Sequence, residues 1–224
     1  MPSDKYPDLK GTIFIVTYGR SGSTLLQSLL QSIPGAHITG ENTGTLEGLY
    51  LAGKRARLSH RTWGQKSQSK SHPWYGIDKI DPDRYEQRLA EVFIEEILQP
   101  PADTRWYGFK EIRYPRLENE FPAFLQFCQR NFENPFFVFN SRNGEEVAKS
   151  KWWAKHPREK VLTLVKKMDS RFARFAKNNA ANSHHVFHEE TVADPQSLMP
   201  LFTKIGEPLD LDLAAEILSK PLTH

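Results

Sequence analysis

Apolar residues along the chain fall into short continuous runs and into stretches with helical spacing. Continuous runs of this length predict buried strands. Four such runs are TIFIVTY from Thr12, RWYGFKEI from Arg105, PFFVFN from Pro135 and HHVFHEE from His184. After the first run, leucines recur at helical spacing between residues 25 and 30, and Pro34-Gly35 ends the pattern. A strand, a turn and an amphipathic helix therefore follow one another directly.

The stretch DPDRYEQRLAEVFIEEIL, residues 81–98, predicts a helix. Asp81 is a capping residue, Pro82 suits the first turn, and apolar side chains recur from Leu89 onwards. We expect another helix over GEEVAKSKWWAK, residues 144–155, and further helices around Pro195 and Ala214. Strands that alternate with helices predict an α/β fold, with a central parallel sheet covered by helices on both faces.

One stretch departs from this alternation. Residues 54–71, KRARLSHRTWGQKSQSKS, are basic, rich in serine and weakly patterned. We expect a basic loop insertion around residues 54–80 within a single domain of residues 1–224. It is either a solvated loop or a lid that attracts an anionic substrate. Trp63, Trp74 and Tyr75 lie around it, where they pack locally or stack on a sugar or an adenine.

Composition narrows the function classes. A net charge of +3, from 30 Lys and Arg against 27 Asp and Glu, is too small to indicate non-specific nucleic-acid binding. The single cysteine, Cys128, cannot form an internal disulfide, and its apolar neighbours predict a core position. Neither a signal-peptide pattern nor a run of about 20 apolar residues is visible, so we expect a soluble cytoplasmic protein without a membrane span.

The turn after the first predicted strand, YGRSGST, has the features of an anion site. A turn into a helix N-terminus presents backbone N–H groups and the positive end of the helix dipole. Gly19 and Gly22 permit unusual backbone conformations, and Arg20 adds a forked cationic donor. The hydroxyl groups of Ser21, Ser23 and Thr24 are further candidate donors. No lysine precedes the final Ser or Thr, which argues against a loop that hydrolyses ATP or GTP.

A second candidate phosphate site lies at the end of the PFFVFN run, where Arg142 is followed eight residues later by Ser150. The two sites together resemble the sulfotransferase family that uses 3'-phosphoadenosine 5'-phosphosulfate (PAPS). That family has a T-Y-P-[KR]-S-G-[ST]-T segment for the 5'-phosphosulfate, and an Arg with a Ser eight residues on for the 3'-phosphate. Residues 17–24, TYGRSGST, are similar to the first motif, with Gly19 where the family has proline.

The resemblance spans roughly residues 12–210 and implies a P-loop-like sulfotransferase fold, with PAPS as donor and 3'-phosphoadenosine 5'-phosphate (PAP) as product. A third segment, VFHEETVADP, is similar to the family's V-x-Y-E-D-L-x-x-D-P, with His188 at the tyrosine position. His188 is therefore a candidate adenosine contact, and the alternative is a histidine that packs on the surface or in a strand. Trp152 and Trp153 follow Ser150 and serve either helix packing or adenine stacking.

The catalytic base differs from that of the common cytosolic branch, in which it is the histidine of a Lys-Thr-His motif. Here the corresponding residues are Lys110, Glu111 and Ile112. Gly40-Glu41, with Glu41 21 residues beyond Arg20, resembles the carbohydrate and tyrosylprotein branches, which use a glutamate. We therefore expect Glu41 to be the base, with Glu111 as its rival. Lys110 either contacts the sulfonate or forms a structural ion pair.

We predict a PAPS-dependent sulfotransferase that acts on a hydroxyl of a carbohydrate or glycoconjugate, without a metal and without a nucleic-acid partner. A small hydroxylated metabolite or a lipid remains an alternative acceptor. The other classes are a nucleotide-dependent phosphotransferase, against which the missing loop lysine argues, and a nucleotide-binding module without catalysis. On a strand His184 and His188 share a face while His185 points away, which argues against a histidine metal cluster.

Overall fold

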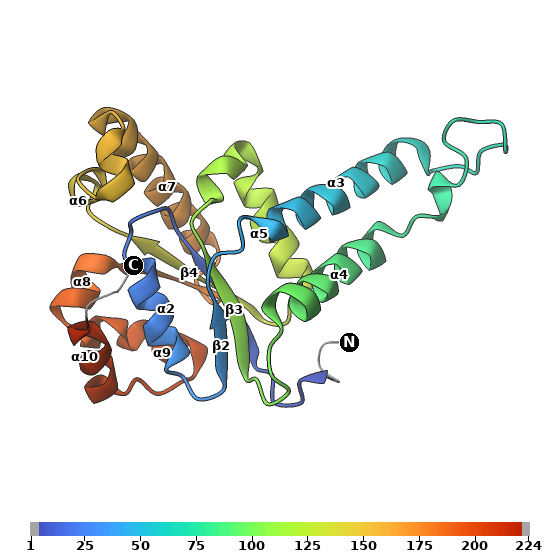
Figure 1. Ribbon diagram of the computed structural model, residues 1–224. Coiled ribbons are helices and arrows are strands. Elements are labelled where there is room, and N and C mark those ends of the chain that lie inside the picture. The colour runs from blue at the N-terminus through green and yellow to red at the C-terminus, as the bar shows by residue number, and fades with distance from the viewer. Residues whose placement is uncertain (1–4, 221–224) are drawn as a thin grey trace.

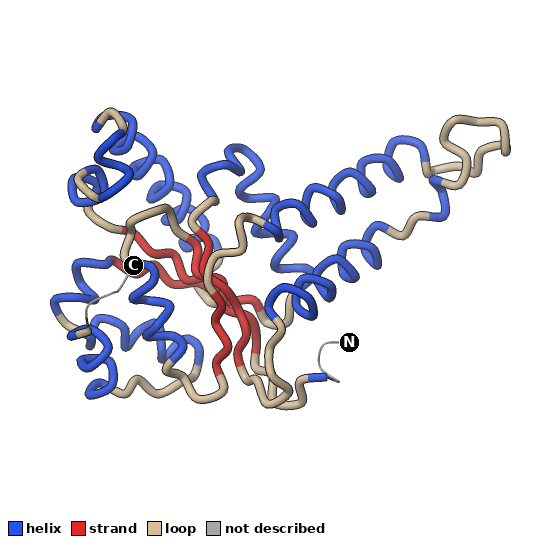
Figure 2. Tube along the Cα trace, in the orientation of Figure 1, coloured by secondary structure: helices blue, strands red, loops and turns tan. Residues whose placement is uncertain are grey.

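A five-stranded parallel sheet lies at the centre of the computed structural model, which describes residues 5–220. The spatial order is β2-β3-β1-β4-β5, and every neighbouring pair is parallel. Figure 2 shows the strands running side by side between helices. The strands are β1 (Gly11–Val16), β2 (Ala36–Thr39), β3 (Trp106–Glu111), β4 (Pro135–Ser141) and β5 (Ser183–Phe187). The predicted parallel α/β fold is confirmed.

Helices cover both faces of the sheet because alternate residues of its central strand point to opposite sides. Ile13 and Ile15 of β1 belong to one buried apolar cluster, and Phe14 and Val16 belong to the other. The first cluster includes α2 (Ser23–Gln31), α9 (Met199–Ile205) and α10 (Leu211–Ser219). The second includes α3 (Thr45–Trp63), α4 (Pro82–Val92), α5 (Phe121–Asn131) and α7 (Arg158–Asn178). Strands buried on both faces explain the continuous apolar runs of the sequence.

Shorter helical segments complete the chain. They are α6 (Gly144–Ala148) and α8 (His188–Ala193), 3-10 helices over Ile77–Lys79, Tyr114–Glu120, Lys151–Lys155 and Pro195–Leu198, and a π-helix over Phe93–Leu98. Cys128 is buried in α5, as predicted. Among residues 5–220, no helix is both long enough and apolar enough to cross a membrane.

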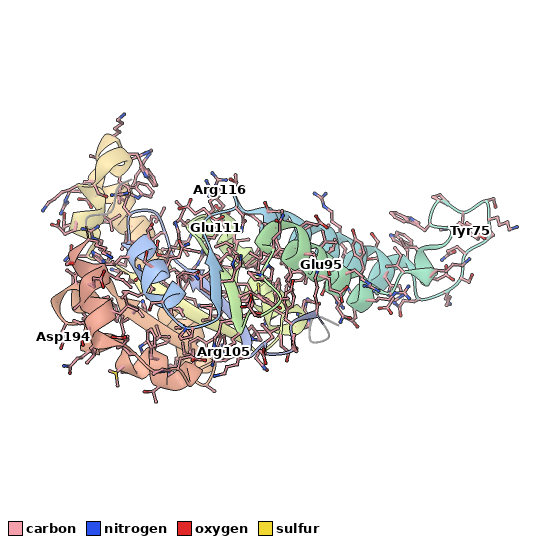
Figure 3. The ribbon with its side chains drawn as sticks, turned by 60° about the horizontal axis from the view of Figure 1, so that its bottom comes forward. Tyr75, Glu95, Arg105, Glu111, Arg116 and Asp194 are labelled. Carbon is pink, nitrogen blue, oxygen red and sulfur yellow. The ribbon has the colours of Figure 1, made fainter. Side chains whose placement is uncertain are left out.

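The prediction of a basic loop from residue 54 is wrong for its first ten residues, because α3 continues to Trp63. With α4 it forms an arm that projects from the sheet, and Tyr75 lies near its tip (Figures 1 and 3). Lys, Arg, Leu and Ala are good helix formers, so a basic composition does not oppose a helix. The helical pattern is weak because α3 buries only Leu46, Tyr50 and Gly53.

Two further expectations need correction. The predicted helix over residues 144–155 is interrupted, since Ser150 stands between α6 and the 3-10 helix Lys151–Lys155. Its hydroxyl donates a hydrogen bond to the carbonyl of Val147 at 2.8 Å, a local bond that competes with helical continuation. The last predicted strand ends at Phe187, and His188 is the first residue of α8.

Candidate active site

The turn between β1 and α2 lies at the carboxyl edge of the sheet, beside the corresponding ends of β3 and β4. Arg20 has φ 69° and Gly22 has φ 79°, so the turn passes twice through the left-handed region. Such a conformation is rare for arginine and marks a backbone that its surroundings hold in place. The conformation of the turn therefore fixes the positions of the first backbone N–H groups of α2, which have no acceptors within the helix.

Side chains from outside the turn hold its carbonyl groups. Trp153 Nε1 donates to the carbonyl of Gly19 at 2.9 Å, and Asn140 Nδ2 donates to the carbonyl of Ser21 at 2.8 Å. Between them, Arg142 Nη1 donates to the carbonyl of Arg20 at 3.2 Å. Three successive carbonyl oxygens thus have hydrogen-bond donors as partners. An anion cradle requires this, because a free carbonyl oxygen would repel the anion.

Most of the predicted site residues line one cavity of about 240 Å³ above this turn. Nine of them meet there, although they come from five segments of the chain. The predicted residues in the lining are Gly19, Arg20, Gly22, Ser23, Thr24, Glu41, Lys110, Arg142 and His188. Ile112 and Trp152 complete the lining.

Two predicted donors have other contacts. The side chain of Ser21 is fully buried, and its hydroxyl lies 2.6 Å from that of Thr17, beneath the turn. Ser150 is absent from the cavity lining, and its hydroxyl donates to the backbone of α6. Ser21 therefore holds the shape of the turn, whereas Ser23 and Thr24 line the cavity.

Arginine donors give the cavity its electrostatic character. The Nε atoms of Arg20 and Arg142 are buried and have no hydrogen-bond partner among residues 5–220. A buried donor without an acceptor is unfavourable, and a cationic one more so. Burial, and then the nearby Arg142, lower the pKa of His188, so its ring is neutral at pH 7. The cavity is therefore suited to a ligand that brings negatively charged oxygens.

Glu41 is the carboxylate of the cavity, and two cations hold it. Lys110 Nζ lies 2.6 Å from Glu41 Oε1, and Arg113 Nη1 lies 3.1 Å from Oε2. The Glu41 side chain keeps 30% of its surface exposed, whereas the Lys110 side chain keeps 8%. Arg113 could not be predicted from the sequence, because no motif marks a residue whose role is to contact two carboxylates that lie 70 residues apart in the chain, Glu41 and Glu111.

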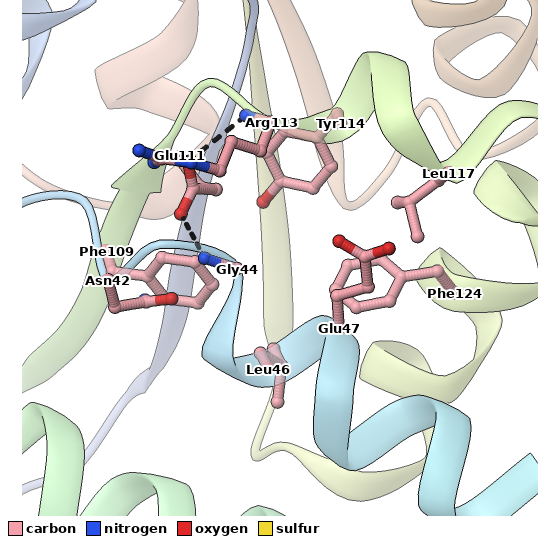
Figure 4. A pocket seen from close by; sticks show the side chains of 10 residues that line it. All are labelled: Asn42, Gly44, Leu46, Glu47, Phe109, Glu111, Arg113, Tyr114, Leu117 and Phe124. Atoms are coloured by element: carbon pink, nitrogen blue, oxygen red, sulfur yellow. Dashed lines mark hydrogen bonds and ion pairs between the residues drawn. The ribbon is translucent and has the colours of Figure 1, made fainter.

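Glu111 has a different environment (Figure 4). Its Oε1 accepts hydrogen bonds from the backbone N–H groups of Ile112 and Arg113 and from Arg113 Nη1, and its Oε2 accepts from the N–H of Gly44. It lines a separate cavity of about 20 Å³, room for a single water molecule, and its side chain is 6% exposed. Glu111 therefore ties the end of β3 to the turn that follows Glu41.

Two glycines of the turn allow aromatic side chains to approach its backbone closely. A Cβ atom on Gly19 would lie 2.4 Å from the ring of Trp152, and one on Gly22 would lie 2.2 Å from the ring of His188. The rings of Trp152 and Trp153 are in contact, with centroids 4.1 Å apart and planes tilted by 31°, and Trp152 remains partly exposed at the cavity. The two glycines thus let an indole and an imidazole pack against the backbone of the turn.

Comparison with known proteins identifies a family for the chain. The sequence model of the sulfotransferase family matches residues 12–212 of the chain. This range contains every residue of the cavity lining. A search of curated proteins finds no significant match to the chain.

Proposed function

Because this chain belongs to the sulfotransferase family, whose members transfer sulfonate groups, we propose that its donor is PAPS and its acceptor a hydroxyl group of a carbohydrate or glycoconjugate. The observation that carries the donor assignment is the pair of buried arginine Nε atoms without partners, Arg20 and Arg142, at one cavity. PAPS brings negative charge at both its 5' and its 3' positions, and two separate cationic donors suit such a ligand.

In this proposal, different residues at the cavity bind the 5'-phosphosulfate, the 3'-phosphate and the adenosine of PAPS. Arg20, with the amides and hydroxyl groups that begin α2, receives the 5'-phosphosulfate. Arg142 receives the 3'-phosphate. Ser150 completes that site if its hydroxyl turns away from the Val147 carbonyl, to which it now donates. His188, neutral and adjacent to Gly22, lies on the adenosine side.

Glu41 acts as the general base in the proposed reaction. It removes the proton of the acceptor hydroxyl, and the acceptor oxygen forms a bond to sulfur while the bond from sulfur to the 5'-phosphate oxygen breaks. The leaving phosphate of PAP keeps the electron pair. Arg20 and Lys110 stabilise the negative charge that develops on it, in a cavity where such charges are only partly screened.

The environments of the two candidate carboxylates favour Glu41 over Glu111. Glu41 lines the large cavity and is partly exposed, so an acceptor can reach it. Glu111 already accepts four hydrogen bonds from its neighbours. Arg113 binds both carboxylates and holds Glu41 in place. A carbohydrate acceptor is supported by the resemblance of this glutamate to the base of the carbohydrate branch.

Transfer of labelled sulfonate from PAPS to a panel of sugars, phenols and lipids tests this proposal, together with calorimetric titration of PAP. Glu41→Gln is expected to lower kcat about 10² to 10⁴-fold, because it removes a base, and to retain PAP binding. Glu111→Gln, checked for its free energy of unfolding, is the comparison for the rival base. A near-normal kcat of Glu41→Gln with saturating substrates would exclude Glu41 as the base. Absence of PAP binding to the unmodified protein would exclude the proposed donor.

A further inference from the structure

Tyr18, two residues beyond β1, is fully buried and contacts Arg142, the residue proposed to bind the 3'-phosphate. Its ring stacks on Phe172 of α7, with an interplanar angle of 3°. The N–H of Arg142 donates to the Tyr18 hydroxyl at 3.0 Å. The hydroxyl hydrogen has two acceptors within reach, Asp169 Oδ1 at 3.1 Å and the Arg142 carbonyl at 3.2 Å. The charged acceptor makes the stronger bond.

A chain of hydrogen bonds holds Asp169 in turn. Ser141 Oγ donates to Asp169 Oδ1 at 2.5 Å, and His185 Nε2 lies 2.7 Å from Ser141 Oγ. Burial lowers the pKa of His185 to about 4, so its ring is neutral at pH 7. Because the Ser141 hydroxyl donates to Asp169, His185 Nε2–H is the donor to Ser141 Oγ. Every proton in the chain then has one acceptor. Residues of β4 and β5, Ser141 and His185, thus hold the Asp169 carboxylate in place, and this carboxylate in turn accepts a hydrogen bond from the Tyr18 hydroxyl.

Arg142 is consequently held at both of its ends by the turn that cradles the 5' group. Tyr18 holds its backbone N–H, and the carbonyl of Arg20 holds its Nη1. Its Nε remains without a partner among the described residues. The contacts from Tyr18 and Arg20 set the distance between the turn and the remaining donors of Arg142. This distance has to match the spacing of the 5' and 3' groups on one ribose.

We propose that Tyr18, anchored by Asp169, is a positioning residue that gives the site its preference for a nucleotide with a 3'-phosphate over one with a free 3'-hydroxyl. The inference rests on the proposed function, in which Arg142 contacts the 3'-phosphate. No other side chain among residues 5–220 accepts a hydrogen bond from the backbone N–H of Arg142. Without the Tyr18 hydroxyl, the Arg142 backbone loses its anchor, while the amides of α2 that hold the 5' group are unaffected.

Tyr18→Phe tests this directly, because it removes the hydroxyl and keeps the ring that stacks on Phe172. PAP and adenosine 5'-phosphate are titrated calorimetrically against the unmodified and the variant proteins. The affinity for PAP is expected to fall about tenfold, the effect of losing one or two hydrogen bonds, and that for adenosine 5'-phosphate to change less than about twofold. KM for PAPS is expected to rise by the same factor as the PAP dissociation constant, with kcat within about twofold.

Tyr114→Phe is the matched control. Its hydroxyl is also buried but has no hydrogen-bond partner among residues 5–220, so the preference for PAP over adenosine 5'-phosphate is expected to stay unchanged. Asp169→Asn is the second variant. It removes the charge that anchors Tyr18 and is expected to lower the same preference, whether or not Tyr18→Phe folds.

The outcomes separate this inference from the proposed function. An unmodified protein that does not prefer PAP over adenosine 5'-phosphate contradicts the proposed donor, and the inference with it. If the unmodified protein prefers PAP and both variants keep that preference, the inference alone is overturned. Equal losses of affinity for the two nucleotides also overturn it, because they would give Tyr18 a purely structural role in the turn.

Discussion

His185 makes the stability of the protein depend on pH in a way that can be calculated. Burial, and then the neighbouring His184, lower its pKa to about 4, against about 6.5 for an exposed histidine. The unfolded chain therefore binds a proton between these values that the folded chain excludes. The stability due to the neutral ring is fully present above pH 6.5 and is lost as the pH falls towards 4. The difference between a pKa of about 6.5 in the unfolded chain and about 4 in the folded one corresponds to about 3 kcal/mol in total.

Between pH 7 and pH 5 this single group is expected to lower the free energy of unfolding by about 2 kcal/mol. His185→Gln removes the titration and keeps an amide that can donate to Ser141 Oγ, the partner of His185 at 2.7 Å. Urea unfolding of both proteins at pH 7 and pH 5 gives the difference between their pH dependences, in which the other titrating groups cancel. The unmodified protein is expected to lose about 2 kcal/mol more than the variant. Equal losses would refute the reasoning, because they would mean that the folded protein does not exclude the proton from this ring.

Two further predictions concern the frame of the sheet. Gly108→Ala is expected to destabilise the protein by more than about 3 kcal/mol in urea unfolding, since the added Cβ would lie 1.9 Å from the carbonyl oxygen of Ile13 across the β1–β3 pair. Gly48→Ala, an exposed helical position with no atom within 4 Å of the added Cβ, is the control and should be neutral or stabilising. Glu207→Gln is expected to lower the free energy of unfolding by about 2 to 4 kcal/mol, because the 2% exposed carboxylate accepts hydrogen bonds from Lys10, Arg105 and Trp106 Nε1. A loss below about 0.5 kcal/mol would contradict the importance of this buried cluster.

The parts of the fold that follow from local sequence were predictable. Strands buried on both faces produce continuous apolar runs, and Asp81 accepts the N–H of Arg84 at 3.0 Å, as expected of a helix cap. The length of α3 was not predictable in this way. This helix projects from the sheet and buries few side chains, so its sequence lacks the regular apolar spacing that predicts a helix packed on a core.

In the candidate site, too, features set by local sequence were predictable, whereas contacts between distant segments were not. The glycine-rich turn, Arg142 and Glu41 are marked by spacing along the chain, and the structure brings them to one cavity. Arg113 and Asn140 act through contacts between distant segments, which a single sequence does not reveal. Ser21 shows the converse difficulty, because a hydroxyl in a phosphate-binding pattern is here buried beneath the turn.

The arm of α3 and α4 has a mechanical consequence for the proposed base. Its first helix begins at Thr45, four residues after Glu41, and the 19 residues of α3 span about 28 Å. At its root, the N–H of Gly44 is bonded to Glu111, which shares Arg113 with Glu41. Trp63, whose indole stacks on that of Trp74, is the last residue of α3 and lies at the opposite end of the helix from Glu41. We expect a displacement of the arm to reach the proposed base through the contacts at its root.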